Sequence, residues 1–391
     1  MTFKTTSPVD AGMDAAQLDE AWDSLEQAAE AHEFGGAVSL IVRHGQIVVA
    51  RATGWAVREP EEERSPMEMD TILDLASLTK VVATTPAVLK LVADGKIDLD
   101  EPVGQILPEF GTEGKKAEVT IRRLMSHSAG MIAWRGVFME GVGPEAYLES
   151  FARDQPEMPP GEQVVYSCAG FITLGEVVRR VTGESVASFA TREVFAPLGM
   201  TDTMFTPPEH LRDRIAATEY GNVHETAMAG AAPVGGRWRD YLLRGEVHDG
   251  NAWYGFQGVA ANAGLFGTAM DLARYGQAWL DGGELDGVRI LPEEIVREAT
   301  REQTGLDAPN DRRGLGWQMA PRPNEDPGNH SGRGLSQRAF GHTGFTGTSL
   351  WMDPERDLII VLLANRVHPT VNPAYLPTRA IFTEAVARAC A

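Results

Sequence analysis

Apolar residues recur at helical spacing near the start of the chain. Leu18, Trp22, Leu25 and Ala29 lie on one face of a helix that the pattern predicts over residues 12–33. A Gly-Gly pair follows and ends the pattern. We therefore expect an amphipathic helix that packs its apolar face against the rest of the protein.

Runs rich in β-branched and aliphatic residues occur near both ends of the chain. Residues 37–42 and 46–52 flank a His-Gly pair, and residues 347–352 and 358–364 flank an Asp-Pro-Glu-Arg-Asp segment. Each linker has the composition of a hairpin turn. We predict two hairpins, and a last helix over residues 373–389 closes the chain.

The middle of the chain has helical patterns that Gly and Pro separate. Helices are predicted over residues 77–93 and 171–181, and a glycine follows shortly after each. Residues 205–265 are rich in Gly, Trp and His and have weak periodicity. We interpret that segment as mostly loops.

Strands at both ends with helices between them predict an α+β fold. One antiparallel sheet would be built from both chain ends and flanked by the terminal helices, with a mostly helical domain inserted. Residues 1–70 and 312–391 would then form the α/β domain, and residues 71–311 the insertion. A chain of 391 residues is long enough for two such lobes. We expect the binding site in the crevice between them.

The charge of the chain narrows its partners. The sequence has 55 acidic against 35 basic side chains, a formal charge of -20, and such a surface repels phosphate backbones and anionic lipids. We therefore expect neither nucleic acid nor a membrane as a partner. Residues 1–20 are polar and acidic, where a signal peptide has a basic start and an apolar middle, which predicts a cytoplasmic protein. The oligomeric state is left open.

The cysteines and histidines give no metal or disulfide pattern. Cys168 and Cys390 lie far apart in the sequence, which excludes a disulfide framework. Neither His-Glu-x-x-His nor Cys-x-x-Cys occurs, so we expect no metal and no cofactor. With 43% hydrophobic and 23% charged residues, the composition is that of an ordinary soluble globular protein.

Ser77 and Lys80 form the single Ser-x-x-Lys pattern of the sequence, at the predicted start of a helix. A spacing of three places the hydroxyl and the amine one turn apart on the same face. A serine nucleophile needs a neighbouring base, and a lysine serves if its pKa is lowered. The alternative without catalysis is that Ser77 caps the helix and Lys80 is solvated. The flanking residues are apolar, however, and burying a lysine among them without a function would cost free energy of folding.

Two further motifs follow in the chain. Tyr166-Ser167-Cys168 stands ahead of a predicted helix, and His342-Thr343-Gly344 ahead of a predicted strand. With Ser77 and Lys80 they resemble the serine β-lactamase and penicillin-binding-protein superfamily, in particular the class C β-lactamase-like group that includes esterases. The resemblance spans most of the chain and takes in residues 124–130, 264–269, 271–273 and 364–366.

The resemblance implies roles for these residues. Ser77 would be acylated, and Lys80 and Tyr166 would share the role of the base. The backbone N–H groups of Ser77 and Phe345 would form the oxyanion hole, each contributing about 3 kcal/mol to the transition state. No cofactor is implied, and the substrate would be a small ester or amide.

Two departures from the family pattern bear on the substrate. Cys168 stands where β-lactamases usually have an Asn, and a thiol cannot donate a comparable amide hydrogen bond to a substrate. His342 stands where a Lys is more usual, so a fixed cation for a substrate carboxylate is missing unless the imidazole is protonated. Both changes favour neutral esters over β-lactams.

Other chemistry has weaker support. Cys168 as a nucleophile has no dedicated base beside it. The Gly-x-Ser-x-Gly signature is absent, and residues 183–187 are the segment most similar to it. The absence disfavours an α/β-hydrolase fold. His248 and Asp249 are candidates for the pocket lining, although a solvated turn explains them equally well.

These observations predict a serine hydrolase that cleaves carboxylic esters through an acyl-enzyme on Ser77. An amidase, a D-amino-acid peptidase or a weak β-lactamase acting on cell-wall substrates is the first alternative. A ligand sensor without catalysis is the second, although intact Ser77, Lys80 and Tyr166 argue against a retired site.

Overall fold

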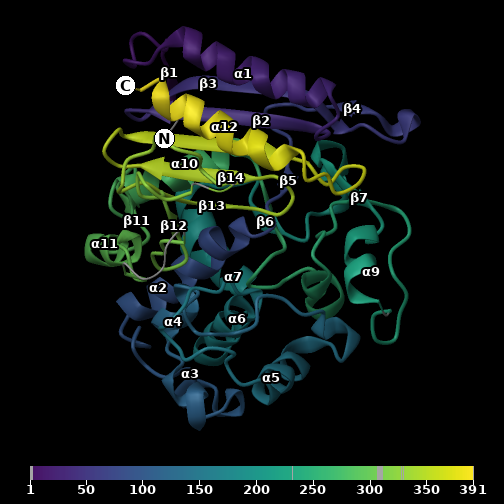
Figure 1. The fold of residues 1–391 in the computed structure, drawn as a ribbon, viewed down its shortest axis with the longest axis vertical. Helices are drawn as coiled ribbons and strands as arrows, with labels where there is room; N and C mark the ends of the chain where they lie inside the picture. The colour runs from purple at the N-terminus through teal and green to yellow at the C-terminus, as the bar shows by residue number, and fades with distance from the viewer. Residues whose placement is uncertain (1–2, 231, 306–310, 327, 329, 391) are drawn as a thin grey trace.

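A computed structural model describes residues 3–230, 232–305, 311–326, 328 and 330–390. A layered sheet and its helices form one lobe, and a mostly helical lobe lies beside it (Figure 1). Both chain ends lie in the sheet lobe, where the first and last helices run side by side. The predicted α+β class is confirmed.

The described strands of the main sheet come from the two ends of the chain. Their order is β1-β3-β2-β15-β14-β13-β12, with β4 paired to β3. All of these pairs are antiparallel except that of the short edge strand β1 with β3, which is parallel. The bounds are β1 Lys4–Thr5, β2 Gly36–Arg43, β3 Gln46–Val57, β4 Ser65–Pro66, β12 Gln318–Met319, β13 Phe340–Thr343, β14 Ser349–Asp353 and β15 Leu358–Ala364.

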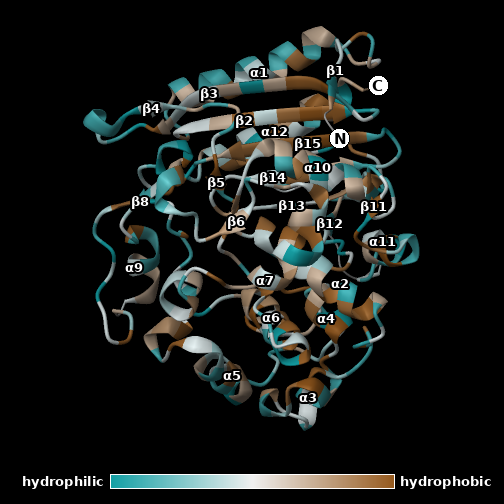
Figure 2. Ribbon diagram, turned by 180° about the vertical axis from the view of Figure 1, so that it is seen from behind, coloured by the Kyte–Doolittle hydropathy of each residue, from teal (hydrophilic) through white to brown (hydrophobic). Residues whose placement is uncertain are grey.

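Helices cover both faces of this sheet. Helices α1 (Ala15–Glu30) and α12 (Tyr375–Arg388) contact each other on one face, and α10 (Ala269–Leu280) packs against β2, β14 and β15 on the other. Strand β2 is therefore buried on both sides: Val38, Leu40 and Val42 belong to one apolar cluster, and Ala37 and Ile41 to another. Period-two alternation of a continuous apolar strand explains this pattern, and Figure 2 shows its hydrophobic colouring.

The other lobe is built mostly from the middle of the chain. The remaining elements between β4 and β12 are α2 Thr85–Ala93, α3 Val103–Ile106, α4 Ile121–Met125, α5 Gly143–Arg153, α6 Cys168–Thr182, α7 Val186–Ala190, α8 Ala196–Leu198, α9 Val223–Ala229 and α11 Glu293–Thr300, with short strands β5 Leu73–Asp74, β6 Met204–Phe205, β7 Ala217–Tyr220, β8 Leu242–Arg244, β9 Leu265–Gly267, β10 Glu284–Leu285 and β11 Val288–Arg289. The β10–β11 hairpin packs against α10.

Most predicted elements are confirmed, with small shifts. The helix predicted over residues 77–93 begins with a π-helical turn, η2 (Lys80–Thr84), before α2. The loop-rich segment 205–265 contains short strands, α9 and a second π-helical turn, η8 (Asn251–Gly255). The domain bounds stay a prediction, and α10, inside the 71–311 segment, packs on the sheet.

Strand β13, which carries a predicted motif, was not among the strands predicted from the sequence. His342 and Thr343 end strand β13, which pairs with β12 and β14, whereas the sequence placed their motif ahead of a strand. Gly341 and Gly344 hide the β pattern, because glycine has no side chain to contribute to it. Among the described residues, no helix is long and apolar enough to cross a membrane.

Candidate active site

Ser77 lies at a sharp turn between strand β5 and the helix that follows. Ala76, just before it, has a positive φ of 46°, which is uncommon for a residue with a side chain. The Asp74 carboxylate accepts a hydrogen bond from the Ala76 N–H at 2.8 Å and holds this turn. The turn places Ser77 at the rim of the cavity between the lobes.

The Lys80 amine reaches back to Ser77. Lys80 Nζ lies 3.0 Å from Ser77 Oγ, and Lys80 is fully buried. The same amine donates to the backbone oxygen of Asn262 at 2.9 Å and lies 3.5 Å from Cys168 Sγ. The predicted pairing of Ser77 and Lys80 in space is therefore present, and the lysine does not extend into water.

A hydrogen-bonded loop presents Tyr166 to this pair. Ser167 caps helix α6, because its Oγ accepts from the Gly170 N–H at 3.0 Å. His127 holds both sides of the tyrosine: its backbone oxygen accepts from the Val165 N–H at 2.8 Å, and its Nδ1 accepts from the Ser167 N–H at 3.0 Å. The segment 124–130, noted in the sequence, thus positions the tyrosine loop.

The Tyr166 ring lies against the Lys80 amine. Lys80 Nζ is 5.0 Å from the ring centroid, and the Tyr166 hydroxyl is buried. Burial raises the pKa of the Tyr166 hydroxyl, and the positive charge of Lys80 opposes that shift. Tyr166 is therefore a neutral phenol at pH 7.

The lysine and its neighbours titrate together. Burial by itself lowers the pKa of Lys80, but its interactions with Cys168, Tyr166 and Asp249 together raise it by more, so its pKa lies above the ordinary value. Burial also raises the pKa of the Cys168 thiol, which keeps it neutral. A neutral thiol beside a lysine fits a packing and lining role for Cys168 better than a nucleophilic one.

Ser77 and Phe345 both line the cavity, and their backbone N–H groups are candidates for the oxyanion hole. Within the described parts of the chain, neither the Ser77 N–H nor the Phe345 N–H donates a hydrogen bond to the protein. Two hydrogen bonds join the segment after β13 to the turn before Ser77. Thr346 Oγ1 donates to the backbone oxygen of Asp74 at 2.7 Å, and Thr348 Oγ1 donates to the backbone oxygen of Leu75 at 3.1 Å. This arrangement suits an oxyanion hole.

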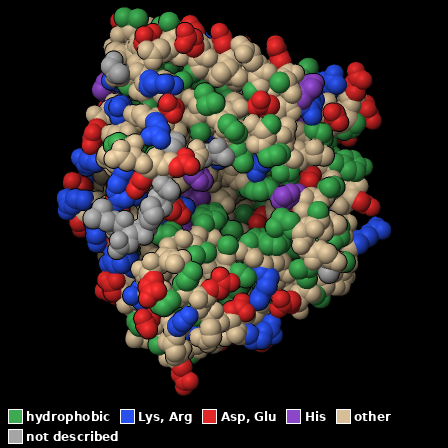
Figure 3. Space-filling model, viewed as in Figure 1, with side chains coloured by type: hydrophobic (Ala, Val, Ile, Leu, Met, Phe, Trp, Pro, Cys, Tyr) green, Lys and Arg blue, Asp and Glu red, His purple; other side chains and the backbone are tan. Residues whose placement is uncertain are grey.

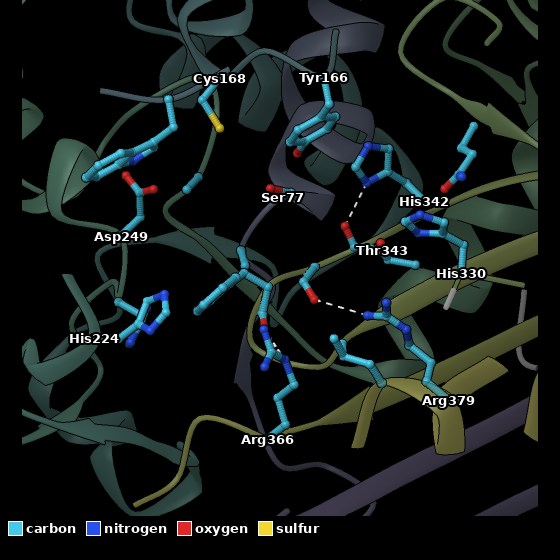
Figure 4. Close-up of a pocket in the computed structure, with 18 of the residues that line it drawn as sticks. Ser77, Tyr166, Cys168, His224, Asp249, His330, His342, Thr343, Arg366 and Arg379 are labelled. Carbon is cyan, nitrogen blue, oxygen red and sulfur yellow. Dashed lines mark hydrogen bonds between the residues drawn. The ribbon is translucent and has the colours of Figure 1, made fainter. Parts of the chain in front are cut away.

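The cavity between the lobes has a volume of about 620 Å³. Figure 3 shows it as a hollow rimmed by hydrophobic side chains, with histidines on two sides. Figure 4 shows Ser77 facing the space, Cys168 and Tyr166 beside it, and His342 further along the same wall. His248 and Asp249 line the cavity too. This confirms the prediction that the pair lines the pocket, and it excludes the alternative of a solvated turn.

Comparison with known proteins now decides the family. The beta-lactamase family matches residues 22–384. The chain belongs to the beta-lactamase family. A Salmonella agona (strain SL483) protein named "Putative D-alanyl-D-alanine carboxypeptidase" is 30% identical, over 95% of this chain and 88% of that protein.

Solved structures agree on the fold. A penicillin-binding protein homolog from Caulobacter crescentus superposes with a TM-score of 0.71 at 25% identity, covering 97% of this chain and 99% of that one. A family VIII carboxylesterase gives a TM-score of 0.69 at 24% identity, with the same coverage. The resemblance seen in the sequence is thus confirmed at the level of a beta-lactamase-family serine hydrolase.

His342 of this beta-lactamase-family protein is neutral. Burial and then the charges of Arg313 and Lys80 lower its pKa well below the ordinary value. Its Nδ1 lies 2.8 Å from the Thr343 oxygen, and a carbonyl only accepts, so Nδ1 carries the proton. The side chain therefore supplies no positive charge, as the sequence indicated.

The pocket nevertheless has fixed cations at other positions, which the sequence reasoning missed. Arg313, Arg366 and Arg379 line the cavity, and all of them are buried. Arg313 lies 5.6 Å from the Tyr166 ring centroid. Arg313 and Arg379 lie outside the motifs and Arg366 ends the segment 364–366, so only the folded chain brings the three charges together at the site.

Asn262 is another residue that the sequence reasoning missed. Its backbone oxygen holds the Lys80 amine, and its side chain lies 3.4 Å from the Asp249 carboxylate. The signal was its place just before the motif at 264–269. Among the described residues, no cluster of His, Cys, Asp and Glu could hold a metal ion.

Proposed function

We propose that this protein hydrolyses carboxylic esters through an acyl-enzyme on Ser77. The observation that carries the proposal is the 3.0 Å contact between Ser77 Oγ and the buried Lys80 amine, beside the Tyr166 phenol. The unpaired N–H groups of Ser77 and Phe345 supply donors for the developing oxyanion. A nucleophile, a proton acceptor and oxyanion donors then converge on one cavity.

The reaction balances with these groups alone. Ser77 Oγ bonds to the carbonyl carbon, and its proton passes to the Lys80–Tyr166 pair in its deprotonated state. The bond from carbon to the leaving oxygen breaks, and the alcohol departs with that proton. Water then attacks the acyl carbon, gives a proton to the same pair, and Ser77 regains it as its ester bond breaks.

A carboxypeptidase is the second candidate, and the arginines favour it. Arg313, Arg366 and Arg379 offer a cationic wall to a substrate carboxylate, and guanidinium groups bind carboxylates strongly. The relative named for D-alanyl-D-alanine points the same way. A sensor without catalysis keeps the weakest support, because Ser77, Lys80 and Tyr166 are placed for reaction.

Labelling tests the proposal. We expect a fluorophosphonate to add one covalent group to Ser77 in intact-protein and peptide mass spectra, and p-nitrophenyl acetate to release a burst of nitrophenol. Both signals should vanish in Ser77→Ala and persist in Ser188→Ala, a change on the surface of α7. Full esterase activity in Ser77→Ala would exclude the acyl-enzyme, and an unlabelled wild type would favour the sensor.

A further inference from the structure

Opposite charges lie at the two ends of the catalytic cavity. Asp249 lies on the side of Cys168, and Arg379 and His330 lie on the side of His342, with Ser77 between the two groups (Figure 4). Arg313 belongs to the second group, since it bridges to Gln318 of strand β12, which pairs with Gly341 next to His342. A substrate whose scissile carbonyl lies at Ser77 therefore meets a carboxylate on one side and a guanidinium on the other.

Asp249 has one carboxylate oxygen to spare. Its Oδ1 accepts from the Ala252 N–H at 2.8 Å and from Asn262 Nδ2 at 3.4 Å. No donor in the described parts of the chain contacts its Oδ2, and the residue lines the cavity. Figure 4 shows the Asp249 side chain on the Cys168 side of this cavity.

A second acid and an aromatic ring accompany Asp249. Glu225, only 6% exposed, accepts from the Gly250 N–H at 2.8 Å and also lines the cavity, as does Trp134. Burial and then the charge of Asp249 raise the pKa of Glu225 to about 7, so Glu225 carries only part of a negative charge at neutral pH. Negative charge together with an aromatic face forms a favourable environment for an organic ammonium. A neutral acyl group there would remove water from Asp249 without replacing its hydrogen bonds, which is unfavourable.

The opposite end carries a cation with spare donors. Arg313 is 4% exposed, and its Nη1 has no hydrogen-bond partner among the described residues. Its Nε lies 2.6 Å from Asp311 Oδ1, so the Asp311 carboxylate pairs with the Nε side of the guanidinium. Arg313 lines the cavity next to the reacting groups, and a buried guanidinium in that place is complementary to a carboxylate.

We propose that the substrate is dipolar, with a protonated amine in the acyl part bound by Asp249 and a carboxylate in the leaving part bound by Arg313. Aminoacyl esters and dipeptides with both ends free belong to this class. The inference rests on the proposed acyl-enzyme at Ser77 and adds its substrate class. It makes Asp249 the residue that selects a free amine.

Three depsipeptides of one scaffold test this class. Alanyl-lactate, in both enantiomeric forms, has an ester at the scissile position, a free ammonium and a free carboxylate. N-acetyl-alanyl-lactate lacks the ammonium, and the methyl ester of alanyl-lactate lacks the carboxylate. We expect kcat/KM to be highest for the dipolar compound of the preferred enantiomer, by at least about tenfold over each blocked form.

The variant Asp249→Asn then tests the residue. An Asn Oδ1 keeps the acceptor for the Ala252 N–H, and an amide NH₂ replaces the spare oxygen. The ratio of kcat/KM for alanyl-lactate to that for its N-acetyl form should fall at least about tenfold. Asp240→Asn makes the same charge change on an exposed residue and should leave the ratio unchanged.

Each outcome decides the inference separately from the proposed function. If the N-acetyl compound is hydrolysed as fast as alanyl-lactate, or if Asp249→Asn leaves the ratio unchanged, the dipolar substrate is excluded. The same holds if no depsipeptide reacts while p-nitrophenyl acetate still acylates Ser77. Loss of Ser77 labelling in the wild type would instead remove the proposed function itself.

Discussion

The Lys80 amine donates a hydrogen bond to the backbone oxygen of Asn262 at 2.9 Å, across 182 positions of the chain. This contact fixes the direction of the lysine side chain, because the amine then lies within 3.0 Å of Ser77 Oγ as well. A flexible four-carbon chain is thereby ordered before any substrate binds. Ordering in advance is what a catalytic group needs.

Replacing Lys80 with Met should abolish turnover without emptying the core. Methionine fills a similar volume but cannot accept or donate the serine proton. We expect kcat for p-nitrophenyl acetate to fall by about 10³-fold. Lys96→Met, on an exposed residue beyond α2, should keep full activity. Near wild-type rates in Lys80→Met, measured by steady-state kinetics, would remove the lysine from the mechanism.

Activity should rise with pH above neutrality. The pKa values of both Lys80 and Tyr166 are raised, so near pH 7 the pair holds both protons and has no site for the serine proton. As pH rises, the pair loses one proton, with an apparent pKa that belongs to the pair, and becomes an acceptor. A pH profile of kcat/KM, corrected for spontaneous ester hydrolysis, should increase from pH 7 toward pH 9. A profile that falls over this range would contradict the assignment.

Gly344→Ala should damage the oxyanion hole. A Cβ there would lie 2.1 Å from Thr348 Oγ1 and 2.6 Å from the Leu75 oxygen, both on the tie that aligns Phe345 with Ser77. We expect a loss of about 1–3 kcal/mol of stability and of about 100-fold in kcat, measured by thermal melting and ester hydrolysis. Gly236→Ala, where a Cβ meets nothing within 4 Å, is the control.

Arg313→Gln should separate the ester and carboxypeptidase candidates. Glutamine retains donors but no charge, so binding of a substrate carboxylate weakens. We expect the rate on D-alanyl-D-alanine, relative to p-nitrophenyl acetate, to fall about tenfold or more if the carboxypeptidase candidate holds. Arg338→Gln changes an exposed residue and should not alter the ratio. If the ratio of the two rates is unchanged in Arg313→Gln, Arg313 does not bind the substrate carboxylate.

Local patterns were enough for most elements of the fold. The terminal hairpins and helices follow from periodicity, since β2 and β15 are continuous apolar runs between turn residues. Strand β13 was not predicted because its pairing with neighbouring strands, and not its own glycine-containing sequence, makes it a strand. The turn that begins at Gly344 likewise depends on contacts with Leu75 and Thr348.

By itself the sequence determined the family, the α+β class and the spacing that brings Ser77 to Lys80, because these depend on residues close together in the chain. Only the tertiary structure decided the charge of the pocket. His342 is neutral because it is buried, and the cations come from Arg313, Arg366 and Arg379. Side chains distant in sequence meet only when the sheet and the helical lobe close around one cavity, and substrate selection depends on that closure.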